Sequence, residues 1–264
     1  MQLFGGFLLG IFIAGLAWRL GALNRSGAVA AALSGGLIFG LGGLAWSALL
    51  LTFFISSSAL SRAFAKRKQE LAEKFSKGHT RDWGQVLANG GLGAALVVAH
   101  ALQPGETWPW IAFAGAMAAV NADTWATELG VLNPTPPRLI SSWRSVERGA
   151  SGAISAFGSL AALGGAALVA GIAAAFSASP GQLAVLIAAT LGGLGGAFFD
   201  SLLGATVQSI YWCPNCQKET ERHPDHLCGT PTVHLRGWRW LNNDWVNFLA
   251  SVVGAVVSTA FLIL

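Results

Sequence analysis

The chain has 264 residues, of which 53% are hydrophobic and 11% are charged, whereas soluble domains carry roughly 25% charged residues. This composition excludes a water-soluble globule. The 34 glycines and 11 tryptophans are typical of helices that pack closely in lipid and carry aromatic anchors at the interfaces.

About eight apolar stretches reach the roughly 20 residues that a bilayer-crossing helix needs. We therefore predict an all-α polytopic membrane protein, one integral membrane domain over residues 1–264, with spans near 2–18, 27–43, 44–60, 84–102, 109–130, 149–174, 181–211 and 245–264. A tight turn near Gly42 and Gly43 should separate the second span from the third. The first stretch lacks a basic leader and a cleavage site, so we expect a retained helix.

All 16 lysines and arginines fall on one side of the membrane if these spans alternate in direction. By the positive-inside rule this side is cytoplasmic and both termini lie outside, in an inner or plasma membrane or a thylakoid. The basic loop 61–83 is either a topology signal or a surface helix on anionic headgroups, and it offers no folded surface for nucleic acid. The one-sided charge favours an enzyme over a transporter, because alternating access needs polar groups at both faces.

Four acidic residues lie within or at the edges of predicted spans, where ionisable side chains are costly and indicate function. Each lies near the cytoplasmic end of its span, so we expect one shared site formed by Asp123, Glu128, Asp200 and Asp244. Asn121, Thr124 and Glu128 share a helix face with Asp123 on its flank. The helix should therefore end or unwind near Gly130, which would let Asp123 and Glu128 converge.

Two other spans add polar residues at the same depth. In the seventh, small residues recur every fourth position around an acid that demands a partner such as Mg²⁺ or arginine; this seam is Gly192, Gly196, Asp200, Gly204 and Gln208. Asn243, Asp244 and Asn247 form a polar face at the start of the last span, although Asn243 or Asp244 could instead cap the helix. Asn89 either joins the site or packs inside the bundle.

Residues 133–155 place Arg138, Arg144 and Arg148 before a helix start that is rich in glycine and serine. Such a start offers backbone N–H groups and a positive dipole end to an anion, although the arginines could also serve only as topology markers. Together with acids that can hold Mg²⁺, the loop indicates a phosphate-transfer site at the cytoplasmic surface.

A polar cytoplasmic loop, residues 212–243, holds all three cysteines of the chain. Cys213, Cys216, His226 and Cys228 can supply the four ligands of a structural Zn²⁺, with His223 as an alternative ligand. The same loop can be a polar lid with reduced thiols, and both interpretations stay open.

Four motifs occur in order along the chain: NADTWATELG (121–130), RSVERGASGAISAFGS (144–159), GGAFFDSLLGATVQ (195–208) and LNNDWVN (241–247). Together they resemble the integral membrane family that includes the phytyl-phosphate kinase of tocopherol synthesis. More distantly, the chain is similar to CTP-using polyprenol kinases and CDP-diacylglycerol synthase. The resemblance implies a CTP-dependent kinase that converts an isoprenyl monophosphate such as phytyl phosphate into the diphosphate.

The resemblance marks Asn89, Asp123, Thr124, Glu128, Arg144, Gly149, Ser151, Gly152, Ser155, Asp200, Ser201, Gly204, Gln208, Asn243, Asp244 and Asn247. We infer that Asp123, Glu128, Asp200 and Asp244 bind Mg²⁺ bridging the nucleotide phosphates, and that these acids and Arg144 are catalytic. The other marked positions should bind the nucleotide and the lipid phosphate together with Arg138, Ser141, Ser142 and Arg148.

Two other functions stay open from the sequence. A cytidylyltransferase would use the same metals but form a CDP-lipid, and a transporter would move a lipid or an anion without chemistry. The kinase interpretation requires CTP or another nucleoside triphosphate, an isoprenyl monophosphate and the membrane as partners, and no nucleic acid.

Overall fold

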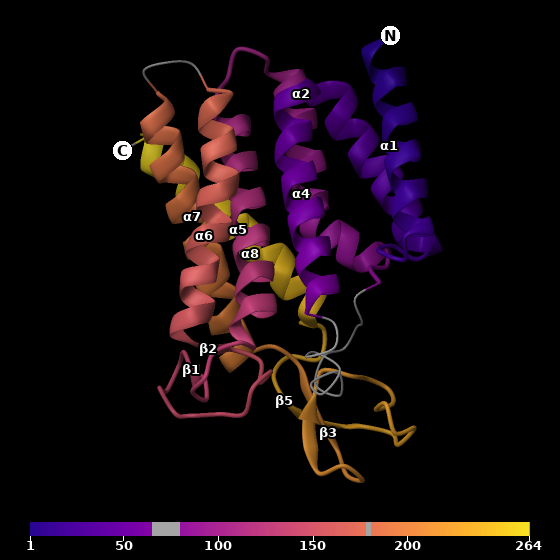
Figure 1. Cartoon of the computed structure of the whole chain (residues 1–264), viewed down its shortest axis with the longest axis vertical. Coiled ribbons are helices and arrows are strands. Elements are labelled where there is room, and N and C mark those ends of the chain that lie inside the picture. The colour runs from indigo at the N-terminus through magenta and orange to yellow at the C-terminus, as the bar shows by residue number, and fades with distance from the viewer. Residues whose placement is uncertain (65–79, 178–180, 264) are drawn as a thin grey trace.

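The protein is a bundle of membrane-length helices with small β-sheets at one end, as the computed structural model in Figure 1 shows. The structure describes residues 1–64, 80–177 and 181–263, so the middle of the predicted basic loop 61–83 lies outside the described residues. The described helices are α1 (Gln2–Arg19), α2 (Arg25–Ala63), α4 (Trp83–Leu102), α5 (Trp108–Gly130), α6 (Ala156–Ala175), α7 (Gln182–Thr206) and α8 (Asn243–Ile263).

Six of the helices in the described ranges are long and apolar enough to cross a membrane, which confirms the predicted helical membrane fold. Helix α5 is not among them. It packs against α2, α4, α6, α7 and α8, so protein rather than lipid surrounds it. The fully buried Asn121 of α5 accordingly donates from Nδ2 to the Gly165 carbonyl oxygen of α6 at 2.8 Å.

Helix α2 reverses direction in its middle, where sequence analysis predicts a turn. Gly43 has φ 66° and ψ −154° inside an otherwise helical run, and a positive φ favours glycine because it has no Cβ. Before the turn, Gly40 lies against Leu3 of α1. After it, Arg62 Nη2 donates to the Leu20 carbonyl oxygen at the far end of α1, at 2.6 Å. The two arms therefore form two antiparallel spans. Among the described residues, these two arms, the other five apolar helices and the enclosed helix α5 agree with the expected total of about eight.

Both chain ends lie at one end of the bundle and all described strands lie at the other, which we call the sheet end (Figure 1). There β1 (Arg138–Leu139) pairs with β2 (Ala153–Ile154). A second sheet has the order β4 (Lys218–Thr220), β3 (Ile210–Cys213) and β5 (Val233–Arg236), with antiparallel neighbours. No pattern in the sequence predicts these sheets.

The strands correct two predicted spans. The span 149–174 begins only at Ala156, because Gly149 and Gly152 have φ values of 78° and 80° that a right-handed helix cannot contain. The span 181–211 ends at Thr206, because Tyr211 and Trp212 pair with both neighbouring strands. In both places the apolar or glycine-rich sequence is compatible with a helix. The segments form strands and turns instead, because they pair with residues that are distant in the chain.

The small-residue seam of α7 lets three helices approach closely. A Cβ on Gly196 would collide with Ala119 of α5 and Ala250 of α8, and one on Gly192 would collide with Ser258 of α8. Close backbone approach of this kind is how helices associate in lipid, where the hydrophobic effect between them is absent. The seam fixes the place of Asp200, which lies one turn beyond Gly196 toward the sheet end.

Candidate functional site

A polar cavity of about 370 Å³ lies at the sheet end of the bundle, within the size range of small-molecule sites. Helices α4 to α8, the end of α2 and the segment before α6 all contribute to its wall. The sequence-predicted residues that line it are Asn89, Asp123, Thr124, Glu128, Arg148, Gly149, Ser151, Gly152, Ser155, Asp200, Ser201, Gln208, Asn243 and Asn247. Most of the predicted site therefore converges on one space.

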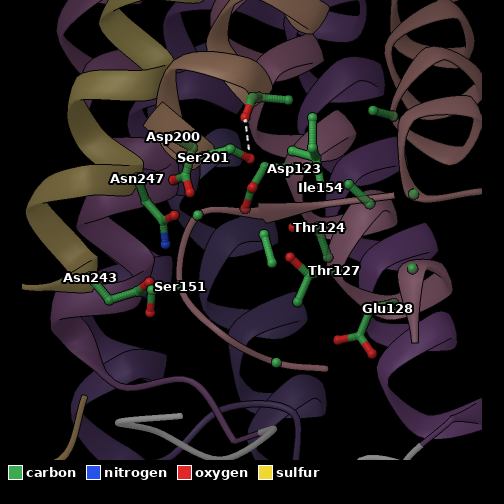
Figure 2. A pocket seen from close by; sticks show the side chains of 18 of the residues that line it. Asp123, Thr124, Thr127, Glu128, Ser151, Ile154, Asp200, Ser201, Asn243 and Asn247 are labelled. Atoms are coloured by element: carbon green, nitrogen blue, oxygen red, sulfur yellow. Dashed lines mark hydrogen bonds between the residues drawn. The ribbon is translucent and has the colours of Figure 1, made fainter. Parts of the chain in front are cut away.

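Two aspartates from neighbouring helices form the acidic part of the pocket. Asp123 of α5 and Asp200 of α7 lie near each other in Figure 2 and interact electrostatically. Glu221, which follows β4, is the other acid that acts on Asp200. The Oδ2 atom of Asp200 is buried and has no hydrogen-bond partner within the described residues. A buried oxygen of this kind, next to two more acids, is suited to a cation.

Glu128 lies on a different wall of the same pocket. Helix α5 ends at Gly130 as predicted, but it stays regular up to that point, so five residues of rotation separate Glu128 from Asp123 by about 140°. Glu128 Oε1 accepts a hydrogen bond from Ser61 Oγ of α2 at 2.6 Å, and in Figure 2 its carboxylate lies apart from Asp123 and Asp200. The two acids of α5 therefore line the same cavity but lie on different walls, so they are not placed to bind one ion together.

Arg81 supplies a positive charge beside Glu128. Its guanidinium donates to Ser57 Oγ at 2.8 Å and to Ser58 Oγ at 3.2 Å, and lies 5.5 Å from the ring centre of Phe53. Burial lowers the pKa of Arg81 to about 10, and Glu128 acts in the opposite direction. Arg81 therefore stays charged at neutral pH and can face an anion in the pocket.

The glycine-rich segment at 149–152 is a turn that crosses the pocket ahead of α6. Ser151 Oγ donates to Glu221 Oε1 at 2.7 Å, and Gln208 Nε2 donates to the same oxygen at 3.0 Å. Helix α6 begins after Ser155, whose Oγ accepts from the Gly158 N–H at 3.1 Å. The expectation of a glycine-rich helix start is corrected here, because the helix dipole begins at Ser155 and not at the glycines.

Helix α8 contributes amides but not its acid. Asn243 and Asn247, one turn apart, line the pocket, whereas Asp244 does not. The cap of this helix is Asn242, whose Oδ1 accepts from the Trp245 N–H at 3.2 Å. The alternative that Asn243 or Asp244 caps the helix is therefore wrong, and the predicted polar face is reduced to the two asparagines.

Of the three arginines in residues 133–155, only the last one lines the pocket. Arg148 lines the pocket and donates from Nη2 to the carbonyl oxygens of Asn133 and Pro134 at 2.8 and 3.0 Å. Arg144 is exposed and does not line it. The other predicted residues outside the lining are Arg138, Ser141, Ser142 and Gly204. The pairing of β1 with β2 and the bond from Leu139 N to Arg144 O, 2.9 Å long, hold residues 138–144 apart from the cavity.

A second cluster of chemically active side chains lies in the loop at the sheet end. The ligand atoms of Cys213, Cys216, His226 and Cys228 all lie within 4.8 Å of one another, the single such group of His, Cys, Asp or Glu in the described part of the chain. The four predicted acids do not form one. His223, the alternative ligand, stacks instead on Tyr211 with ring centres 4.5 Å apart.

The thiols of this cluster affect one another strongly. Hydrogen bonds with Thr230 and His226 lower the pKa of Cys228 from 9.0 to about 5. The hydrogen bond with Cys228, followed by burial and the Cys213 thiol, raises the pKa of Cys216 to about 12. Close thiols of this kind cannot all ionise without a compensating positive charge.

Comparison with known proteins gives the family. The profile of the integral membrane proteins DUF92 matches residues 8–255. The chain belongs to the DUF92 family. Protein PGR of Arabidopsis thaliana is 31% identical, over 97% of this chain and 92% of that protein. An uncharacterized membrane protein of Methanocaldococcus jannaschii is 28% identical, over 97% and 93%. The chloroplastic Protein VTE6 of Arabidopsis thaliana is 26% identical, over 94% and 68%. No solved structure matches significantly.

The pocket of this DUF92 protein also contains residues that sequence analysis misses. Arg81 is the last basic residue of the loop 61–83, which the sequence favours as a topology signal. Gln85 lies at the start of a predicted span. Glu221 and Arg222 lie in the cysteine loop, far along the chain from the acidic motifs. The signal for Arg81 was its place directly before Asp82, which caps α4 by accepting from the Gln85 N–H. No local signal marks Glu221.

Proposed function

We propose that this DUF92 protein is a lipid-phosphate kinase that transfers a phosphoryl group from CTP to an isoprenyl monophosphate. In this reaction an oxygen of the lipid phosphate bonds to the γ-phosphorus, and the bond from that phosphorus to the β-bridging oxygen breaks. The products are the lipid diphosphate and CDP, so atoms and charge balance. The observation that carries the proposal is that paired acids, arginines and a glycine turn meet in one pocket at the membrane boundary.

Part of the pocket wall is apolar. Phe198 of α7 lines the cavity and is 37% exposed. Ala162 and Ala197 continue this apolar wall on α6 and α7. A lipid whose chain lies in the bilayer can therefore place its phosphate among the polar residues. This arrangement supports a lipid substrate better than a wholly water-soluble one.

Mg²⁺ fits the acidic part of this pocket. Asp123 and Asp200 would hold it, since hard oxygen ligands from one or two carboxylates plus substrate phosphates are its usual coordination, and the buried Oδ2 of Asp200 is a suitable donor. When bound, the ion supplies charge neutralisation to the phosphates. Asp244 lies outside the lining and Glu128 is bonded to Ser61, so the proposed ligand set is narrower than the four acids that the sequence suggests.

The other groups would position the anionic substrates. Arg148 and Arg81 would attract phosphate oxygens, and the asparagines Asn243 and Asn247 offer amide donors. The turn at 149–152 brings Gly149, Ser151 and Gly152 into the pocket lining. A lipid monophosphate is already anionic, so no strong general base is required.

We assign the sheet end to the cytoplasmic side, where the nucleotide is available. The described lysines and arginines lie at this end and support the assignment by the positive-inside rule. One plant relative is named as chloroplastic. For this chain we propose a plastid or thylakoid membrane if it comes from a plant, and an inner or plasma membrane if it comes from a bacterium. An impermeant maleimide should label Ser145→Cys only after cells are opened and Glu106→Cys in intact cells. Labelling of both in intact cells would contradict the orientation.

The decisive assay uses purified protein, Mg²⁺, labelled CTP and phytyl phosphate. Release of CDP with formation of phytyl diphosphate supports the kinase. Release of pyrophosphate with a CDP-lipid identifies a cytidylyltransferase, which would use the same acids but direct attack to the α-phosphorus. Absence of turnover with phytyl, geranylgeranyl and farnesyl phosphates would contradict both enzymes and favour a transporter.

Arg148 and Arg144 provide a matched pair for the phosphate-binding prediction. Lysine keeps the charge but loses the planar pair of donors that fits phosphate oxygens. Arg148→Lys should lower turnover at least ~10-fold, about 1.4 kcal/mol of transition-state stabilisation, whereas Arg144→Lys should stay within about 2-fold because that side chain lies outside the pocket. This order differs from the expectation from the sequence, which makes Arg144 catalytic and Arg148 a binding residue. Initial rates on equal amounts of inserted protein decide it, and equal losses in both variants would contradict the pocket assignment.

A further inference from the structure

The cysteine loop has the geometry of a metal site that is separate from the proposed phosphate pocket. Cys213 Sγ lies 3.6 Å from Cys228 Sγ, and His226 Nδ1 lies 3.5 Å from Cys216 Sγ and 3.3 Å from Cys228 Sγ. A tetrahedral zinc ion with ligand bonds of about 2.3 Å to sulfur and 2.0 Å to nitrogen places its ligands about 3.8 Å apart for two sulfurs and 3.5 Å for sulfur and nitrogen. The observed separations match this arrangement.

The backbone around the cluster also favours a metal. The Cys216 N–H points at Cys213 Sγ at 3.5 Å. Gln217 N donates to the Cys213 carbonyl oxygen at 2.9 Å, and Gly229 N donates to the His226 carbonyl oxygen at 2.9 Å. Each ligand pair therefore lies on its own tight turn, and the two turns face each other. Cys213 Sγ and Cys228 Sγ are 3.6 Å apart, whereas disulfide sulfurs bond at about 2.05 Å, so the geometry fits metal ligands better than a bridge.

The cluster is attached directly to the pocket through one hairpin. Cys213 is the last residue of β3 and pairs with Lys218, the first residue of β4. Glu221 follows β4, and its Oε1 accepts from Ser151 Oγ of the glycine turn and from Gln208 Nε2 at the end of α7. The hairpin thus carries Cys213 and Cys216 at its turn and leads into the pocket wall at Glu221.

We propose that Cys213, Cys216, His226 and Cys228 bind one structural Zn²⁺, and that this ion fixes the hairpin so that Glu221 holds the glycine turn in place. Glu221 is then a positioning residue that acts through Ser151 and Gln208. The proposal that the loop binds zinc does not depend on the proposed kinase activity. A catalytic role of the glycine turn does depend on that proposed function.

Elemental analysis of protein purified without chelator or added metal tests the ion. We expect about one zinc per chain in the unsubstituted protein and in His223→Ala, whose imidazole stacks on Tyr211, and less than about 0.2 in Cys213→Ser and His226→Ala. Cobalt exchange on the unsubstituted protein should give the absorption of a tetrahedral thiolate site even if the variants fail to fold. Metal-free protein, or a mass that shows a Cys213–Cys228 disulfide, would overturn the proposal.

Hydrogen exchange tests the connection to the pocket without any turnover. The amides of residues 149–152 should exchange at least ~10-fold faster after zinc removal and in Glu221→Gln, while Glu221→Gln keeps its zinc. Glu219→Gln, on the exposed side of β4, should leave both zinc and exchange unchanged. If the turn exchanges at the same rate with and without zinc, the positioning role of the hairpin is refuted. Loss of activity in the kinase assay alone bears on neither result.

Discussion

Asp200→Asn should lower turnover at least ~100-fold, about 2.7 kcal/mol of transition-state stabilisation, while the protein remains folded. Asparagine has nearly the volume of aspartate but carries no negative charge, so the cation that the two aspartates would hold loses a ligand. The Oδ2 atom of Asp200 is buried and has no hydrogen-bond partner in the described chain. The substitution therefore removes no hydrogen bond to Oδ2 that stabilises the fold.

The stability of this variant separates a catalytic from a structural role. Burial, followed by the neighbouring acids Asp123 and Glu221, disfavours a charge on Asp200, so asparagine at this position should leave the unfolding temperature equal or higher. Acids kept at an energetic disadvantage are typical of functional sites. A lower unfolding temperature with proportionally lower activity would instead indicate that Asp200 supports the fold.

Matched variants complete this test. Glu106→Gln neutralises an exposed acid between α4 and α5, at the end of the bundle opposite the pocket, and should retain full turnover. Asp123→Asn should match Asp200→Asn, and the double variant should be little worse than either, because the two would serve the same ion. Kinase rates and fluorescence-monitored unfolding in detergent provide both readouts. Near-normal turnover of Asp200→Asn would remove this residue from the site.

The helices and the acidic pair could be predicted from the sequence because the signals are local. Apolar runs of bilayer length fix the spans, a glycine marks the reversal at Gly43, and acids within spans are costly enough to indicate a site. The family follows for the same reason, since four short motifs carry it. These features depend on residues close together in the chain.

What the sequence did not predict depends on contacts between distant segments. Glu221 reaches Ser151, 70 positions away, and no pattern around either residue announces the contact. Arg81 is ordered because its backbone pairs with residues 22–24, which a basic loop does not reveal. The sequence marks Arg144 as catalytic and Arg148 as a binding residue, and only the fold around the β1–β2 pairing shows that Arg144 lies outside the lining. The same cause explains the helix that begins at Ala156 rather than at the glycines.

Gly152→Ala should be the most damaging small substitution in the pocket. Its φ of 80° lies in the left-handed region, which is unfavourable by roughly 1–2 kcal/mol for a residue with a Cβ. That Cβ would also collide with the backbone nitrogen of Ala205 on α7, and overpacking of this kind costs about 1–3 kcal/mol. Together we expect a loss of about 2–5 kcal/mol of stability.

Turnover should fall further than stability alone explains. Relief of the collision must move the turn away from α7, and the turn carries Ser151, which bonds to Glu221. A displacement of about 1 Å in a positioned group can lower a rate ~100-fold.

Gly21→Ala is the matched control, because Gly21 also has a positive φ, 74°, but nothing lies within 4 Å of the added Cβ. It should lose only the roughly 1–2 kcal/mol of the backbone conformation and keep its turnover. Unfolding of both variants in detergent, with rates measured on the folded fraction, separates the two effects. Equal behaviour of the variants would mean that close contact between the glycine turn and α7 is not needed for the site.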